Sequence, residues 1–232
     1  GRFKKWEGPP FTLPVTRDQT GVVGWRQGAQ TILLVGSANY EDGLTLGSCV
    51  RQFDVGKKAV DDSLPPSPSS SGPLATADVD GDGDLDLFVG GRVFPGKYPR
   101  AASSVLFRNT GGKFEIDVEN TRRLAGIGLV SGAVFCDIDA DGDPDLILAC
   151  DWGPVKVFRN NQGQLIDASE QLGLTQFKGW WNGVSVGDFD EDGKLDIVAS
   201  NWGRNTKYES HRQKPLQIVY GDLNGSGNYD GV

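Results

Sequence analysis

The sequence contains no methionine, one histidine and three cysteines, so several common site chemistries are missing from it. Cys49, Cys136 and Cys150 show no metal-ligand spacing, and an odd number of cysteines cannot form a closed disulfide framework. Because Cys136 and Cys150 lie at the ends of apolar runs, we interpret the thiols as small buried hydrophobic groups. Neither a histidine and cysteine metal cluster nor a phosphate-binding loop is predicted.

Long hydrophobic runs are also missing. No apolar stretch approaches the roughly 18 residues needed to cross a membrane, so no transmembrane segment is predicted. Residues 1–10 lack the hydrophobic region of a signal peptide. Since the chain begins at Gly1 and has no methionine, we interpret it as a piece of a longer protein, and the missing signal peptide is no evidence for a cytoplasmic location.

Glycine and aspartate are abundant instead. The 33 glycines among 232 residues predict many tight turns and short strands and make long helices unexpected. More than half of the 31 acidic residues lie in four short loops. Charge confined to loops differs both from a generally acidic surface and from a basic stripe, so no nucleic-acid partner is predicted.

The strongest signal is an internal repeat of acidic loops, which begin at Asp78, Asp137, Asp188 and Asp222. The first two intervals between loops match a propeller blade with an insertion, whereas the third is shorter. Each loop follows a short run of small and apolar residues, and each of the first three is followed by another apolar run. Each loop with its flanks therefore predicts a β-hairpin.

A second hairpin is predicted further along two of the repeats. Residues 105–109 and 155–160 lead into turns rich in asparagine and glycine and then into short apolar segments. Two hairpins make a four-stranded unit that buries its faces only by stacking on neighbouring units. The predicted fold class is all-β, a partial β-propeller of about four four-stranded blades with calcium loops.

The repeat also predicts the boundaries of the blades within the partial propeller of residues 1–232. Residues 21–40 have the same sequence pattern of apolar runs without the acidic residues, so we expect a first blade without a metal loop. Residues 61–73 are polar and rich in proline, which predicts a mobile linker. The predicted blades cover about residues 19–60, 74–130, 131–181 and 182–215, and residues 216–232 begin a further one.

The acidic loops are predicted metal sites, because carboxylates recur at loop positions 1, 3, 5 and 9. Such clustered charges repel one another, and a hard cation that takes six to eight oxygens, as Ca²⁺ does, relieves the repulsion. The predicted ligands of three calcium sites are Asp78, Asp80, Asp82 and Asp86, then Asp137, Asp139, Asp141 and Asp145, then Asp188, Asp190, Asp192 and Asp196. The fourth loop offers only Asp222, Asn224, Ser226 and Asp230, and we give equal weight to a loop that binds calcium and to one that remains empty.

Other loop positions support this interpretation. Position 6 is glycine in every loop, as a sharp turn requires, and position 7 is excluded as a side-chain ligand because it is Lys194 in the third loop. Position 2 is apolar and is expected to anchor the loop to the core. The EF-hand alternative fails, because it needs glutamate at position 12, where the first and third loops have Val89 and Ala199. Magnesium and solvated acidic turns are weaker alternatives.

Residues 183–198, which contain the third loop, resemble the FG-GAP/VCBS repeat of integrin-like propellers. Residues 150–154, 158–160 and 200–203 resemble bacterial VCBS proteins of the ASPIC type. The resemblance extends roughly over residues 21–232 and implies a seven-bladed propeller, calcium at positions 1, 3, 5 and 9, and a cell-surface, periplasmic or secreted setting. The sequence departs from the pattern in the first blade, which has no acidic loop, and in the fourth loop.

Catalytic interpretations find little support in the sequence. Residues 183–187 match the Gly-x-Ser-x-Gly motif of serine hydrolases, but a metal loop follows and His211 is the single histidine. Tryptophans recur at matching places, which favours packing between blades over platforms that stack a sugar. These tryptophans are Trp25, Trp152, Trp180, Trp181 and Trp202.

The sequence therefore predicts a non-enzymatic scaffold that binds calcium and recognises or adheres to a protein or glycan outside the cytoplasm. The alternative is the propeller domain of a calcium-dependent polysaccharide-degrading enzyme such as a lyase. For that reaction Arg92, Arg108, Arg159 and Arg204 could supply positive charge, but no base is evident.

Overall fold

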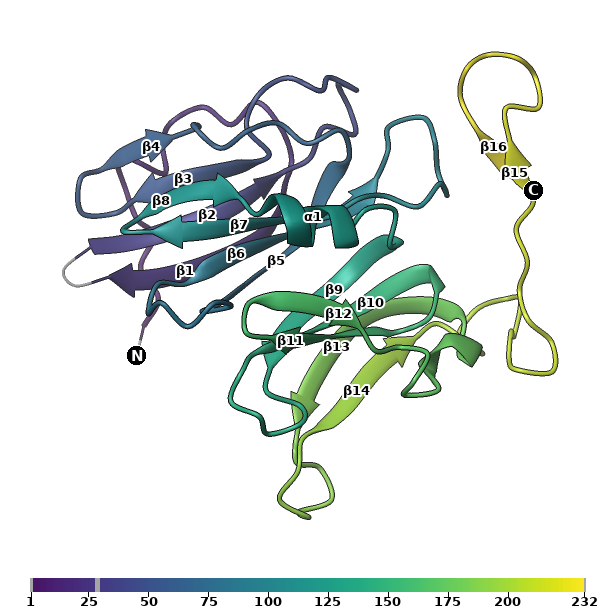
Figure 1. Cartoon of the computed structure of the whole chain (residues 1–232). Helices are drawn as coiled ribbons and strands as arrows, with labels where there is room; N and C mark the ends of the chain where they lie inside the picture. The colour runs from purple at the N-terminus through teal and green to yellow at the C-terminus, as the bar shows by residue number, and fades with distance from the viewer. Residues whose placement is uncertain (1, 28–29, 232) are drawn as a thin grey trace.

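The computed structural model describes residues 2–27 and 30–231, which are folded almost entirely into antiparallel β-sheet (Figure 1). The described helical segments are α1 (Val118–Arg123) and the 3-10 turn η1 (Leu174–Gln176). The prediction of an all-β fold is confirmed. No helix in the described part of the chain has the length and apolar character needed to cross a membrane.

Successive stretches of the chain form successive sheets, as in the blades of a propeller. The first sheet contains β1 (Gln19–Gln27), β2 (Gln30–Ser37), β3 (Val50–Asp54) and β4 (Ala59–Asp61) in that order. The second contains β5 (Ser70–Ala77), β6 (Asp86–Val93), β7 (Val105–Thr110) and β8 (Lys113–Ile116). The third contains β9 (Leu129–Cys136), β10 (Asp145–Gly153), β11 (Lys156–Asn161) and β12 (Gln164–Asp167).

The last two hairpins are shorter than a complete blade. Strands β13 (Gly179–Gly187) and β14 (Asp196–Asn201) pair with each other, and β13 also meets the end of β10. The expected four strands over residues 182–215 are not found among the described residues, because residues 203–215 contain only one large apolar side chain, Tyr208. Strands β15 (Tyr220–Gly221) and β16 (Asp230–Gly231) form a hairpin that stands apart from the sheets (Figure 1).

The hydrophobic core lies between neighbouring sheets. Along β6, Leu87 contacts the cluster shared with the first sheet, whereas the next residue, Phe88, contacts the cluster shared with the third. In the third sheet, Leu146 faces back to the second sheet and Ile147 faces β13 and β14. Since adjacent side chains of a strand point to opposite faces, each sheet buries both faces by stacking. Cys49 is a buried free thiol, and burial raises its pKa to about 12.

The first strands of the sheets approach one another closely, and glycine makes the approach possible. A Cβ atom on Gly72 of β5 would lie 2.8 Å from the Val130 carbonyl oxygen of β9. A Cβ atom on Gly132 of β9 would lie 2.9 Å from Gly183 Cα of β13. Strands β5, β9 and β13 therefore lie backbone against backbone.

The prediction of a mobile linker over residues 61–73 was wrong at its C-terminal end. Residues 70–73 belong to β5, and Ser69, Ser70 and Ser71 are buried. Ser71 Oγ donates to the Ser37 carbonyl at 2.7 Å, and Ser69 Oγ donates to the Ser103 carbonyl at 3.2 Å. These long-range partners satisfy hydroxyl groups that would otherwise favour a solvated loop.

Candidate metal centre

Three acidic loops close the hairpins β5–β6, β9–β10 and β13–β14, and the first aspartate organises each loop. Asp78 Oδ1 accepts a hydrogen bond from the Gly81 amide, and its Oδ2 accepts one from the Gly83 amide, both at 2.9 Å. Asp137 and Asp188 likewise accept from the glycine at position 6 at 3.0 Å. That glycine has a positive φ in all three loops, which explains why its type does not vary.

The ninth-position aspartate begins the second strand of the hairpin and anchors the loop. Asp86 and Asp145 are fully buried, and each accepts a hydrogen bond from the backbone amide at position 2 of its loop. Each also accepts a backbone amide from the third strand, Asn109 at 2.9 Å and Asn160 at 2.7 Å. Burial raises the pKa of both carboxyl groups.

The remaining aspartates bring carboxylate oxygens together. In each loop three carboxylates have oxygens within 4.8 Å of one another, and the three groups are Asp78, Asp80 and Asp82, then Asp137, Asp139 and Asp145, then Asp188, Asp190 and Asp196. Two oxygens that share one calcium ion at about 2.4 Å each can be separated by no more than roughly 5 Å, so this spacing fits. The donors are all hard oxygens, which is the ligand type that Ca²⁺ prefers. Three aspartate clusters could thus hold metal ions.

The predicted ligands divide into two groups. Positions 1 and 3 belong to the cluster in all three loops, whereas Asp86, Asp141 and Asp192 lie outside it. The bond to the backbone amide of position 7 does not distinguish the groups: Asp141 and Asp192 accept it at 2.9 and 2.8 Å, and Asp82, a member of its cluster, accepts it at 2.9 Å.

The fourth loop has the same closing pattern with fewer carboxylates. The Gly227 amide donates to Asp222 Oδ2 at 2.9 Å, and the Leu223 amide donates to Asp230 Oδ2 at 3.1 Å. The Asn224 side-chain amide donates to Asp230 Oδ1 at 3.4 Å, and Asn224 Oδ1 accepts from the Ser226 amide. The loop fold therefore does not need four aspartates, and the fourth loop offers a cation fewer carboxylates than the other three.

The anchoring role predicted for position 2 holds in part. Val79 is buried in the core between the second and third sheets. Phe189 and Leu223, by contrast, are 59% and 63% exposed, so the prediction was wrong for these two loops. Neither side chain belongs to a buried hydrophobic cluster of the described residues, so these two loops are not anchored in the core.

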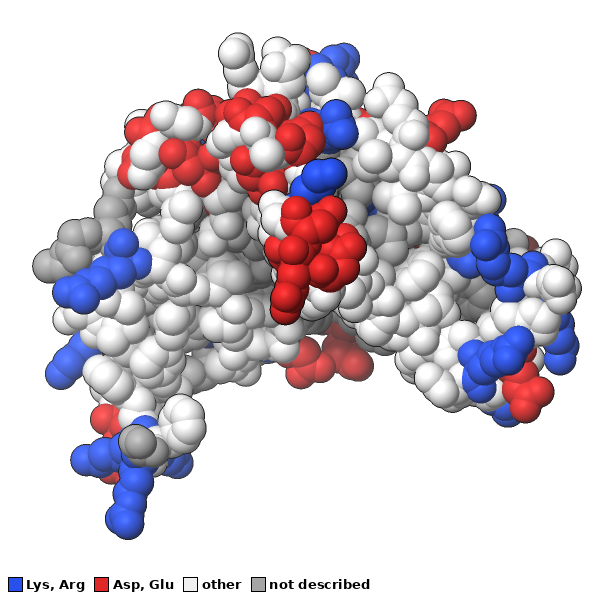
Figure 2. Space-filling model, turned by 90° about the horizontal axis from the view of Figure 1, so that it is seen from below, with Lys and Arg blue, Asp and Glu red and all other residues white. Residues whose placement is uncertain are grey.

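Two arginines contact the loops in a way that the sequence analysis missed. Arg108 Nη1 lies 2.8 Å from Asp86 and 3.5 Å from Asp80, and its Nε lies 2.9 Å from Asp117. Arg159, at the equivalent place in the next sheet, pairs with Asp139 at 3.1 Å. The signal was present as the repeated Phe-Arg-Asn segment. Figure 2 shows acidic side chains gathered in dense patches on one face, with basic side chains next to them.

The loops are also connected to the neighbouring sheet. Asn160 of the third sheet donates through Nδ2 to the Val79 carbonyl of the first loop at 2.8 Å. Arg108 Nη2 donates to the Gly163 carbonyl at 2.7 Å. The first acidic loop therefore lies in the interface between the second and third sheets, and its order affects how these sheets pack.

With this geometry established, the comparison with family models can be read residue by residue. Residues 137–199 match the model of the FG-GAP-like repeat. The matched segment runs from the first aspartate of the second loop through the third loop to β14, so the predicted FG-GAP resemblance is confirmed there, and the ASPIC subtype stays a prediction.

Two further comparisons identify neither a family nor a function. A crystal structure described as BBS1N in complex with ARL6DN, soaked with mercury, is similar at 14% sequence identity and a TM-score of 0.33. The similarity covers 88% of this chain and 69% of that one, and a likeness of this size carries no argument about function. No curated protein sequence matches the chain.

Proposed function

We propose that this chain is a calcium-braced β-sheet scaffold that recognises a protein or glycan outside the cytoplasm and performs no catalysis. One observation carries the metal part of the proposal: three loops repeat the same hydrogen-bonded closure and hold three carboxylates each within 4.8 Å. Solvated acidic turns have no need to converge in the same way three times.

The position of the loops supports a structural role for the metal. Each loop joins the first two strands of a sheet, and the first is hydrogen-bonded to the neighbouring sheet through Val79. Without a cation the clustered charges repel and destabilise these hairpins. At a dissociation constant of about 0.1 mM, which is typical of extracellular modules, ~2 mM calcium stabilises the fold by about 1.8 kcal/mol per site.

The proposed location outside the cytoplasm agrees with this assumed affinity, which is taken from extracellular modules. Sites with dissociation constants near 0.1 mM fill where calcium is millimolar, which is the condition of extracellular modules. The proposal that the chain is not an enzyme is supported by the Gly-x-Ser-x-Gly segment. Ser185 lies inside β13 and pairs with Val198 of β14, so it does not occupy a strand-to-helix turn.

Isothermal titration calorimetry with calcium tests the metal sites. We expect three sites in the wild-type protein and one fewer in Asp190→Asn, which removes a carboxylate from the third cluster. Asp18→Asn changes an exposed aspartate outside the loops and should keep all three. Absence of calcium binding at millimolar concentration, or an equal loss in both variants, would overturn the proposal.

A further inference from the structure

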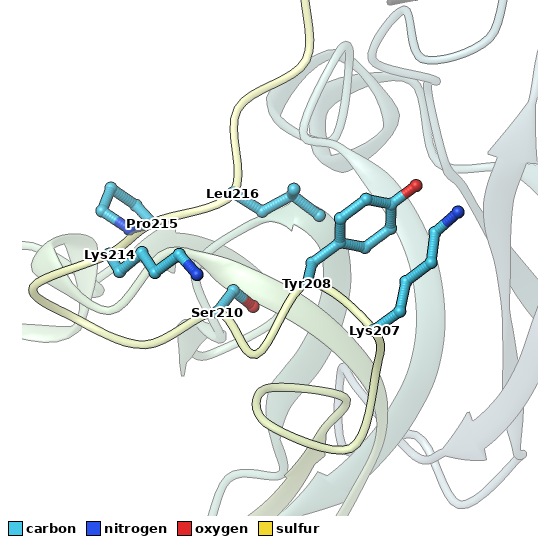
Figure 3. A pocket seen from close by; sticks show the side chains of 6 residues that line it. All are labelled: Lys207, Tyr208, Ser210, Lys214, Pro215 and Leu216. Atoms are coloured by element: carbon cyan, nitrogen blue, oxygen red, sulfur yellow. The ribbon is translucent and has the colours of Figure 1, made fainter.

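The segment that follows β14 encloses a pocket of about 260 Å³ (Figure 3). Its lining consists of Lys207, Tyr208, Ser210, Lys214, Pro215 and Leu216. Two of the six are ammonium groups, and none is acidic. The pocket therefore differs in charge from the aspartate loops and offers a place for an anion.

Backbone contacts give this segment its shape. His211 and Lys214 exchange backbone hydrogen bonds of 3.0 and 2.8 Å, which close a turn. Ser210 Oγ donates to the Gly203 carbonyl at 3.3 Å and so ties the turn to the end of β14. Lys207 Nζ lies 5.0 Å from the centre of the Tyr208 ring, and Figure 3 shows both side chains extending in the same direction.

A row of tryptophans ends at Trp202, next to Gly203, whose carbonyl accepts the hydrogen bond of the pocket residue Ser210. Trp152 lies 5.2 Å from Trp180, and Trp180 stacks on Trp202 at 4.4 Å with an angle of 25° between the rings. Trp202 immediately precedes Gly203 and is 46% exposed, so the last indole of the row is partly accessible. Tyr208 adds a phenol ring that is 49% exposed.

Strand β14 separates this pocket from the third acidic loop. The loop precedes the N-terminal end of the strand, and Trp202 follows its C-terminal end. A negatively charged ligand at the pocket therefore lies at the opposite end of the strand from the carboxylates of Asp188, Asp190 and Asp196. Distance and solvent screening make repulsion by that loop weak.

We propose that residues 202–216 bind an acidic glycan, with Lys207 and Lys214 pairing with its uronate or sulfate groups. The apolar part of a sugar ring packs on Tyr208 and Trp202, and Ser210 Oγ, which donates its proton to the Gly203 carbonyl, can accept a hydrogen bond from a sugar hydroxyl. Exposed aromatic faces beside two ammonium groups favour a glycan over an acidic peptide, which offers no ring to stack. The proposal deepens the recognition role above and rests on it.

Tryptophan fluorescence titrations in 2 mM calcium at low ionic strength test the site. The probes are tetragalacturonate, a heparin-derived tetrasaccharide, neutral maltotetraose and a tetraglutamate peptide, which separate uronate, sulfate, sugar ring and peptide acidity. We expect at least one acidic glycan to bind. The uncharged glycan, maltotetraose, and the acidic peptide, tetraglutamate, should each bind about tenfold more weakly or not at all.

Matched variants locate the binding. Lys207→Gln combined with Lys214→Gln should weaken acidic-glycan binding about tenfold or more, and Tyr208→Ala should weaken it several-fold. Lys57→Gln combined with Lys113→Gln removes two exposed lysines from other sheets and should leave the dissociation constant unchanged. All four positions are on the surface, so a change in folding is not expected; melting curves check this.

Three results would overturn the proposal: no acidic glycan binds, the lysine pair has no effect, or tetraglutamate binds as tightly as the glycans. If calcium still raises the melting temperature in these cases, the metal-braced scaffold stands and only the glycan site fails. A protein that binds tetragalacturonate at these lysines but melts identically in EDTA and calcium would keep the site and overturn the brace.

Discussion

Asp86 and Arg108 show that a carboxylate of an acidic loop can pair with a cationic side chain of the protein. Asp86 accepts hydrogen bonds from two backbone amides and pairs with Arg108, which also lies near Asp80. The guanidinium group thus compensates part of the charge of the first loop when no metal is bound. We infer that the arginine and a calcium ion have overlapping electrostatic roles.

Arg108→Gln tests this overlap. Removal of one partner from a largely buried pair should destabilise the metal-free protein by about 2 to 3 kcal/mol. The loss should be smaller in 2 mM calcium, because the ion compensates the same carboxylates. Urea unfolding in EDTA and in calcium measures both values, and Arg122→Gln, which breaks an exposed pair, should change either by less than about 0.5 kcal/mol. An equal loss in both conditions would contradict the overlap.

A second ion pair, in which only the carboxylate is buried, links the second and third sheets. Asp151 of β10 is buried, and Arg92 of β6 pairs with it at 2.7 Å. Burial raises the pKa of Asp151, although the Arg92 charge acts in the opposite direction. A raised pKa means that the folded state holds the proton more tightly than the unfolded state. The protonated group therefore favours folding at low pH, and this contribution disappears as pH rises through the folded-state pKa.

Arg92→Leu should consequently have a pH-dependent effect. At pH 7 it leaves the buried Asp151 carboxyl group without its counter-ion and should reduce the free energy of unfolding by about 2 kcal/mol, less than for a fully buried pair because Arg92 is partly exposed. The deficit relative to wild type at the same pH should shrink on acidification, since protonated Asp151 needs no counter-ion. The double variant Arg92→Leu with Asp151→Asn should show no such pH dependence, and urea unfolding between pH 7 and pH 4.5 distinguishes the two.

At the scale of elements, the first strands of the sheets control the distance between neighbouring sheets. Gly132→Ala places a Cβ atom 2.9 Å from Gly183 Cα and 3.0 Å from the Val184 nitrogen, and both atoms are backbone. Because neither can rotate away, we expect a loss of about 2 to 3 kcal/mol. Gly56→Ala in a turn meets its nearest atom at 3.5 Å and should change stability by less than about 1 kcal/mol. Equal effects in thermal unfolding would refute the close approach of β9 and β13.

The elements were predictable from sequence to different degrees. The hairpins around the acidic loops have local signals, because a glycine turn between two apolar runs specifies both strands. The N-terminal part of β5, which contains Ser70 and Ser71, was not predicted, since a distant carbonyl group satisfies the Ser71 hydroxyl. Helix α1 has a local signal in its N-cap, Asp117, whose side chain accepts the Asn120 amide.

The candidate site was also predictable from sequence only in part. Positions 1 and 3 follow from the loop sequence, because they converge within one turn. The pairing of Asp86 with Arg108 joins residues from different hairpins, and no local pattern specifies it. The exposure of Phe189 depends on which elements pack against its hairpin and could not be deduced from its apolar character.

At the scale of the whole molecule, the three clusters together should control thermal stability. Three sites at about 1.8 kcal/mol each give roughly 5 kcal/mol, comparable with the stability of a typical domain. Chelation with EDTA should therefore lower the melting temperature by many degrees, and Asp139→Ala should remove part of the calcium-dependent increase. An identical melting curve in EDTA and in millimolar calcium would contradict a structural role for the metal.

The edge of β14 should also affect the whole molecule. Among the described strands β14 pairs only with β13, and Val198 on its outer face is 51% exposed. An uncovered apolar edge favours pairing between copies, so light scattering should detect association that grows with concentration. Val198→Lys should reduce the apparent mass, because a charge on an edge strand opposes pairing. A protein that stays monomeric at high concentration would refute this expectation.

The close approach of β5, β9 and β13 has a consequence for protein engineering. Because main chain meets main chain at Gly72 and Gly132, no choice of side chain can adjust the distance between these strands. Variation is therefore confined to the rim, where the acidic loops and the segment of residues 202–216 join the strand ends. Loops transplanted onto such a frame would inherit a fixed spacing, so the affinity of a redesigned binding surface could be tuned without repacking its support.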